Sequence, residues 1–157
     1  MSNNSGPKHV YEIYVRTTPQ KLWDAITKPE FTRQYFYGSM VKSDWKVGSG
    51  VVHADESGNA MLEGKVIEVD PPRRLVTTFA ARYNHDALSN DDRPSRVTWT
   101  IEARGDVCKL TLVHDDFDCE TATFKSVGPG WNPVLSGLKT LLETGKPLVI
   151  APAPSAA

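Results

Sequence analysis

The sequence has little of what usually identifies a class of protein. Its 157 residues contain two cysteines, Cys108 and Cys119, without C-x-x-C spacing, which favours a reducing compartment over a disulfide framework. No apolar run approaches the roughly 20 residues of a membrane span, and the N-terminus lacks the basic and then apolar stretch of a signal peptide. Basic and acidic residues nearly balance, with a net charge of −1, which gives no reason to expect nucleic acid or an anionic membrane as partner. We therefore expect a cytoplasmic protein.

Catalytic and metal-binding motifs are also missing. There is no G-x-S-x-G, no H-E-x-x-H and no P-loop, which removes three common routes to hydrolysis and phosphate binding. An acidic group follows His114, and with His85 it has the composition of a metal site: Asp115, Asp116, Asp118 and Glu120. We interpret it as a solvated strand end and loop, because short clusters of this kind are usually not ligand sets. No metal and no cofactor are predicted.

Hydrophobic periodicity predicts the elements. Apolar and polar residues alternate over 9–17, as in a half-buried strand. Residues 18–36 read as two short helices, the first capped by Thr18 and the second starting at Pro29, and residues 38–116 carry strand and turn signals. A long helix then ends at Gly145 and begins after Asn132, or one turn earlier at Pro129. Its stripe at helical spacing must pack on a partner: Trp131, Val134, Leu135, Leu138, Leu141 and Leu142.

One hairpin can be predicted residue by residue. Gly105 and Asp106 form a two-residue loop with glycine first, which suits a type II′ turn. That turn sets residues opposite one another whose numbers sum to 211, so Trp99 faces Leu112 and Val97 faces His114 on an apolar face. We place Cys108 on the polar face. A one-residue slip would scramble both faces, which supports this register.

These elements predict an α+β fold. A curved antiparallel sheet of about six or seven strands would pack against two short helices and a long C-terminal helix. Residues 8–150 would form one domain, with a flexible N-terminus at 1–7 and a disordered Ala/Pro tail at 151–157.

The ordered set of segments resembles a known family. The segments are TPQKLWDAITKPEFTRQYF at 18–36, DWKVGS at 44–49, GKVIEVDPPRRLVTTF at 64–79, LTLVHDDF at 110–117 and GWNPVLSGLKTLLETG at 130–145. Together they resemble the START-like (SRPBCC) superfamily with its helix-grip fold, in the branch of the activator of the 90-kDa heat-shock protein ATPase and the calicheamicin-resistance-like proteins. The resemblance implies an apolar cavity between the sheet and the last helix, in members that bind, carry or occasionally transform hydrophobic small molecules. Eukaryotic activators have an additional chaperone-binding domain for which 157 residues leave no room, so the chaperone role is not transferred.

The residues expected to line that cavity come from the closing helix, the apolar face of the sheet and the long helix. A pocket of this kind is mostly apolar with a few polar groups. The predicted ligand-binding residues are Tyr35, Phe36, Trp45, Met61, Phe79, Trp99, His114, Phe117, Trp131, Leu135 and Leu138.

Two titratable residues leave alternatives open. His114 is either a core histidine satisfied by hydrogen bonds or a polar contact in the pocket. Glu63 is either an inward carboxyl with a raised pKa, and so a candidate acid or base, or a surface residue beside inward-facing Leu62, Gly64 and Val66.

Three functions follow from this sequence. The first is a non-catalytic module that binds a hydrophobic small molecule of aromatic, polyketide or lipid-like character, as a monomer or homodimer. The second is a cyclase- or hydrolase-type enzyme that uses His114 or Glu63 as acid or base. The third is a chaperone-associated interaction protein in which the pocket has no role.

Overall fold

A computed structural model describes residues 6–82 and 93–154 of the chain. The elements in chain order are β1 (His9–Val15), α1 (Pro19–Thr27), α2 (Pro29–Tyr35), β2 (Met40–Ser43), β3 (Gly50–Ala54), β4 (Ala60–Asp70), β5 (Arg74–Ala81), β6 (Ser95–Arg104), β7 (Val107–Asp115) and α3 (Ala122–Thr144). The expectations for residues 1–5, 155–157 and His85 lie outside the described residues.

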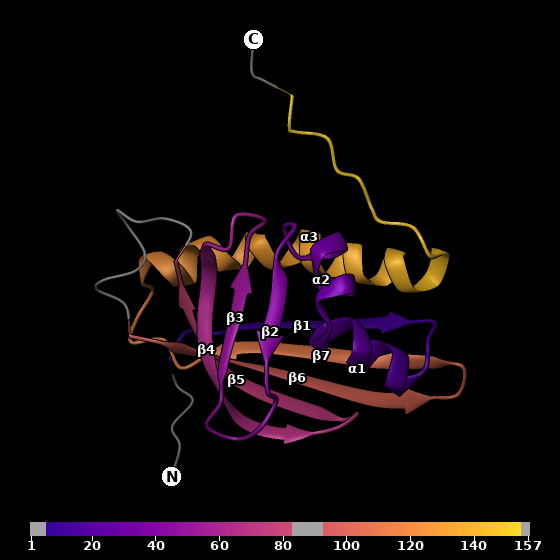
Figure 1. Ribbon diagram of the computed structural model, residues 1–157, viewed down its shortest axis with the longest axis horizontal. Coiled ribbons are helices and arrows are strands. Elements are labelled where there is room, and N and C mark those ends of the chain that lie inside the picture. Colours follow the sequence, from indigo (N-terminus) through magenta and orange to yellow (C-terminus); the bar gives the residue numbers. More distant parts are fainter. Residues whose placement is uncertain (1–5, 83–92, 155–157) are drawn as a thin grey trace.

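The predicted α+β helix-grip architecture is confirmed. Seven antiparallel strands form a curved sheet in the order β1-β7-β6-β5-β4-β3-β2. Figure 1 shows α3 lying lengthwise over this sheet, with α1 and α2 beside its C-terminal half. The apolar stripe of α3 is covered as its spacing predicts, because Trp131 is 4% exposed and Leu138 is fully buried. Within the described residues, no helix combines the length and the apolar character needed to cross a membrane.

The predicted hairpin register is confirmed along its whole length. Trp99 pairs with Leu112, Val97 with His114, and Arg104 with Val107 across the turn. Gly105 has a φ of 66°, the left-handed conformation that a leading glycine supplies in a two-residue hairpin loop.

The prediction for Cys108 is wrong. Its side chain is fully buried in the core, because residue 108 is an even number of positions from Leu110 and Leu112 and therefore shares their face. Burial also raises the pKa of the Cys108 thiol, which keeps it protonated and unreactive.

The long helix begins at Ala122, two to three turns before the two predicted starts, Pro129 and Pro133. Thr121 caps it by accepting a hydrogen bond from the Phe124 amide at 3.1 Å, and both Pro129 and Pro133 lie inside the helix. Proline in a helix interior costs about 3 kcal/mol or more. For this reason the sequence-based prediction put each proline in the first turn of the helix. The C-terminal end at Gly145, with a φ of 76°, is as predicted.

Side chains from other elements hold the proline-containing part of α3. The His9 ring bonds to the Phe124 carbonyl at 2.8 Å, and the Tyr11 hydroxyl donates to the Gly128 carbonyl. The Tyr37 hydroxyl, from the turn after α2, donates to the Gly130 carbonyl at 2.6 Å. These contacts join the helix to β1 and to that turn, so tertiary structure supports a helix that local propensity disfavours.

The two short helices follow their predicted signals. Thr18 caps α1 through the Lys21 amide at 3.2 Å, and Pro19 and Pro29 occupy the first helical positions. α2 meets α3 closely at Gly137, where an added Cβ would lie 3.1 Å from the Tyr35 Cβ. This approach brings the turn after α2 against α3, which matters for the cavity described below.

The close pairing of β4 with β5 yields a stability prediction. A Cβ added at Gly64 would lie 1.9 Å from the Thr78 carbonyl oxygen, an impossible contact with backbone. We expect Gly64→Ala to lower the free energy of unfolding by about 2–3 kcal/mol, measured by chemical denaturation. Gly50→Ala is the matched control, because its nearest neighbour would be 4.0 Å away. Equal stability of the two variants would contradict the prediction.

Candidate functional site

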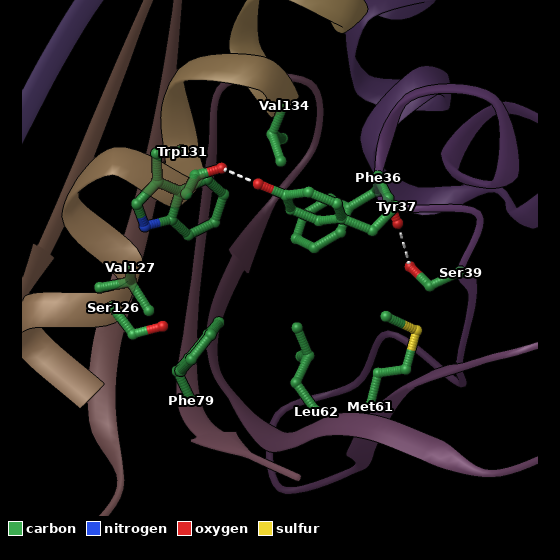
Figure 2. A pocket seen from close by; sticks show the side chains of 11 residues that line it. Phe36, Tyr37, Ser39, Met61, Leu62, Phe79, Ser126, Val127, Trp131 and Val134 are labelled. Atoms are coloured by element: carbon green, nitrogen blue, oxygen red, sulfur yellow. Dashed lines mark hydrogen bonds between the residues drawn. The ribbon is translucent and has the colours of Figure 1, made fainter. Parts of the chain in front are cut away.

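A cavity of about 280 Å³ lies between α3, the β4–β5 part of the sheet and the turn after α2. Figure 2 shows Ser126, Val127 and Trp131 of α3 on one side, Phe36, Tyr37 and Ser39 opposite, and Phe79, Leu62 and Met61 of the sheet between them. The lining is completed by Gly130 and Val134.

The cavity has a buried floor and a partly exposed rim. Phe36, Leu62, Phe79, Val127 and Trp131 are buried, whereas Tyr37, Met61, Ser126 and Gly130 are accessible to solvent. None of the lining residues carries a charge, and the side-chain polar groups are three hydroxyls and the indole nitrogen. A mostly apolar lining with few polar groups is typical of a small-molecule pocket.

Tyr37 spans the rim from a strained turn. Tyr37 and Gly38 have φ values of 53° and 72°, and the Ser39 amide donates to the Phe36 carbonyl at 3.0 Å, so residues 36–39 form a tight turn with two left-handed residues. A left-handed non-glycine residue costs about 1–2 kcal/mol. The hydrogen bond from the Tyr37 hydroxyl to Gly130 offsets part of this cost and fixes the ring beside the cavity.

The structure brings together only part of the predicted ligand-binding set. Four predicted residues line the cavity: Phe36, Met61, Phe79 and Trp131. Three others border two smaller voids deeper in the sheet: Tyr35, Trp45 and Trp99. The remaining four line none of these three hollows: His114, Phe117, Leu135 and Leu138. Tyr35 donates its hydroxyl to the Ala25 carbonyl at 2.7 Å, and burial raises its pKa, so it is a packing residue.

Seven lining residues are missing from the predicted set: Tyr37, Ser39, Leu62, Ser126, Val127, Gly130 and Val134. Val127 and Val134 lie one turn before and after Trp131 on the same face of α3. The predicted stripe already held Val134, and starting the helix after Thr121 would have added Val127. Tyr37 and Ser39 depend on the turn geometry and carry no periodic signal.

His114 takes the core alternative that the sequence left open. It is fully buried, its Nδ1 accepts from the Trp131 indole N–H at 3.0 Å, and its Nε2 lies 2.7 Å from the Ser95 hydroxyl oxygen. An indole nitrogen can only donate, so Nδ1 has no hydrogen and Nε2 carries it. Desolvation, with a smaller contribution from the charge of His9, lowers the pKa of His114 to about 3. A neutral ring with both nitrogens bonded serves packing and has no free group for proton transfer.

Glu63 takes the surface alternative. Leu62 and Val66 are buried, whereas the Glu63 side chain is 46% exposed and its carboxylate lies 3.6 Å from the Arg82 guanidinium. Residues alternate across β4, so Leu62 faces the cavity and Glu63 faces away from it. His114 and Glu63 therefore do not meet in one site.

A second buried histidine, His53, was not among the predicted site residues. His53 on β3 is 8% exposed, its Nδ1 lies 3.0 Å from the Ser39 hydroxyl oxygen, and its ring packs on Phe36 with centroids 4.4 Å apart. Desolvation lowers the pKa of His53 to about 4. It borders both smaller voids, of about 30 and 40 Å³. Val51 and His53 are two positions apart in the strand and therefore share a face, so the strand pattern could have predicted that His53 points inward.

The acidic group after His114 is occupied by arginines. Arg93 bridges Asp116 and Asp118, which lowers the pKa of Asp116, and Arg96 makes a two-pronged ion pair with Asp115. Across residues 6–82 and 93–154, no cluster of histidine, cysteine and carboxylate side chains has the geometry to hold a metal.

One family model matches most of the chain. A family model described as "Activator of Hsp90 ATPase homolog 1-like protein" matches residues 16–143. Three similar solved structures cover nearly the same part of the chain. The Aha1 dimer from Colwellia psychrerythraea has a TM-score of 0.70 at 17% identity and covers 89% of this chain and 98% of that one. An HSP90 activator from Plasmodium falciparum has a TM-score of 0.70 at 21% identity, covering 87% and 96%.

The third similar structure, CalU16 from Micromonospora echinospora, has a TM-score of 0.66 at 20% identity and covers 88% of this chain and 77% of that one. These likenesses show the fold. A comparison with curated proteins found no match.

The two buried histidines predict a loss of stability in acid. In the unfolded chain each histidine takes up a proton near pH 6.5. In the folded protein the pKa is about 4 for His53 and about 3 for His114, so both rings stay neutral until the pH falls to those values. The unfolded state therefore binds more protons below pH 6.5, and the free energy of unfolding falls as pH falls. The slope approaches about 1.4 kcal/mol per pH unit for each histidine.

Chemical denaturation between about pH 7 and pH 5 measures this slope, because the Asp116 carboxyl, with its lowered pKa, titrates only below that window. His53→Leu should reduce the slope by about half. A free energy of unfolding that stays constant over this window would show that the histidines titrate normally in the folded protein.

Proposed function

The chain belongs to the family of Activator of Hsp90 ATPase homolog 1-like proteins, and from that premise we propose that it binds a small hydrophobic molecule in the cavity beside α3. The observation that carries the proposal is a hollow of about 280 Å³ with an uncharged, largely apolar lining, several times larger than the two voids beside it, of about 30 and 40 Å³. Protein interiors contain few voids larger than a water molecule. An apolar hollow of this size has the volume and lining of a site for a small molecule.

The volume limits the ligand. Pockets for drug-sized molecules have volumes of about 300–1,000 Å³, so this cavity is at their lower end. One or two aromatic rings or a short aliphatic chain fit this space. Phe36, Phe79 and Trp131 offer ring edges and faces to an aromatic ligand, and the Met61 sulfur lies at the rim. Among the sequence-based ligand classes we therefore favour small aromatics over large polyketides and long lipids.

The enzymatic alternative has less support. His114 does not line the cavity and both its nitrogens are bonded, and Glu63 faces away from the cavity. General acid–base catalysis needs a group within hydrogen-bond reach of the substrate. A chaperone-associated role has in its favour the family description and the Plasmodium falciparum neighbour's title, and neither is an observation on this chain's surface.

Filling the cavity tests the proposal. We expect naphthalene to raise the melting temperature of the wild-type protein, because a ligand that binds only the folded state stabilises it by mass action. Val127→Phe should abolish this shift, since residue 127 is buried in the cavity lining. Leu142→Phe adds a ring to the same helix outside the cavity and should keep the shift. If both variants lose the melting-temperature shift, or if both keep it, naphthalene binds outside the cavity.

The size limit gives a separate prediction. Naphthalene should bind, whereas pyrene, with four fused rings, should not, because a cavity of about 280 Å³ would need Phe36 or Tyr37 to move before admitting it. Isothermal titration calorimetry with both compounds measures the difference, expected to be at least about tenfold in affinity. Tighter binding of pyrene would show that the cavity opens well beyond its present volume.

A further inference from the structure

The core contains two serine–histidine pairs with the same construction, and one of them is complete. In the first pair the His114 Nε2–H donates to the Ser95 hydroxyl oxygen at 2.7 Å, and Ser95 in turn donates to the Phe79 carbonyl at 3.3 Å. The remaining ring nitrogen, Nδ1, accepts the Trp131 indole N–H at 3.0 Å. Every polar atom of this histidine therefore has a partner inside the protein.

The second pair repeats the first half of this arrangement. The Ser39 hydroxyl oxygen lies 2.7 Å from the Phe36 carbonyl oxygen and 3.0 Å from His53 Nδ1. Two oxygens this close need a hydrogen between them, so Ser39 donates to the carbonyl. It then has only lone pairs to offer to His53, and Nδ1 must carry the ring hydrogen.

His53 Nε2 is therefore an acceptor. Beside His114 the indole N–H of Trp131 donates to the second ring nitrogen, but within the part of the chain that the structure describes no group donates to His53 Nε2. The side chain is 8% exposed, and burial keeps the ring neutral by lowering its pKa to about 4. Every fully buried side-chain nitrogen and oxygen among the described residues has a partner, so this unpaired nitrogen is reachable by a water-sized probe, and the hydroxyl or N–H group of a ligand can reach it too.

The space beside His53 adjoins the cavity. His53 borders a void of about 40 Å³ whose lining shares Phe36, Leu62, Phe79 and Trp131 with the large cavity. A void of that size holds a hydroxyl group or one or two water molecules but no ring. A molecule with its rings in the cavity and a polar group in the void would meet His53.

We propose that the ligand is a neutral one- or two-ring molecule with a hydroxyl or N–H group, and that this group donates its hydrogen to His53 Nε2. This inference rests on the proposed function and adds the polar half of the ligand to it. The lining of the cavity and of both voids holds no ionised side chain that could balance a charge. A carboxylate, which can only accept, meets another acceptor at His53 and is disfavoured. Phenol-like molecules therefore fit better than fatty acids.

The experiment compares two probes of equal size, alpha-naphthol and alpha-methylnaphthalene, by calorimetric titration of the full chain. The measured quantity is the ratio of their dissociation constants in the wild-type protein and in His53→Leu. We expect the preference for naphthol to fall by about tenfold in the variant, because the hydroxyl loses its acceptor. Thr77→Val is the matched control: Thr77 borders the same two voids, and its loss should leave the ratio unchanged.

Each outcome decides between the two proposals. Binding of both probes with the same ratio in wild type and His53→Leu would overturn the role of His53 and leave the cavity proposal standing. Loss of the preference in Thr77→Val would assign the contact to Thr77 and overturn the role of His53. Binding of neither probe would overturn the cavity proposal and this inference with it.

A second measurement uses only the wild-type protein, so it tests the proposal even if the His53→Leu variant does not fold. The nitrogen NMR shift of His53 Nε2 reports whether it accepts a hydrogen bond. Naphthol should move this shift in the wild-type protein, and methylnaphthalene should not. An unchanged shift with bound naphthol, as for a nitrogen already bonded to a resident water, would overturn the proposal.

Discussion

Burial of the Trp131 indole beneath α3 is the constraint on which the rest of the structure depends. The ring is 4% exposed and packs edge-on against Phe36 and Trp99, each with centroids 5.7 Å away. Its N–H cannot be left without a partner in an apolar core, and His114 supplies the acceptor. That requirement fixes the tautomer of His114 and orders Ser95 behind it, so a polar chain crosses the core from the helix to the sheet. One side of the same indole forms part of the cavity wall.

The helix that carries Trp131 is held in place from outside as much as by its own backbone. Pro129 and Pro133 weaken it locally, and His9, Tyr11 and Tyr37 bond to its carbonyls from β1 and from the turn after α2. The contact from Tyr37 has a second effect, because it fixes an exposed ring at the rim of the cavity. One hydroxyl group thus joins the helix to the rim of the cavity.

The two serine–histidine pairs show how similar chemistry serves different purposes in one core. Beside His114 the indole of Trp131 completes the hydrogen bonds, and the pair contributes to packing. Beside His53 the corresponding acceptor opens on voids that adjoin the cavity. An accepting nitrogen that no described group pairs with and that a water-sized probe can reach is open to a ligand donor, so the difference between the pairs is the basis for assigning a ligand hydroxyl to the second one.

The sequence by itself determined the fold class, the hairpin register, the cap of α1, the start of α2 at Pro29 and the burial of the last helix. These depend on alternation, helical spacing and turn residues, which act over a few neighbouring positions. Four residues that it named, Phe36, Met61, Phe79 and Trp131, line the cavity, but it did not name Tyr37 or His53 and did not include the first turns of α3. Only the tertiary structure decided these features, because contacts distant in sequence outweigh local propensity there. Hydrogen bonds from β1 and from the turn after α2 support the helix through its prolines, and the positions of Ser39 and Trp131 decide which histidine nitrogen is left for a ligand.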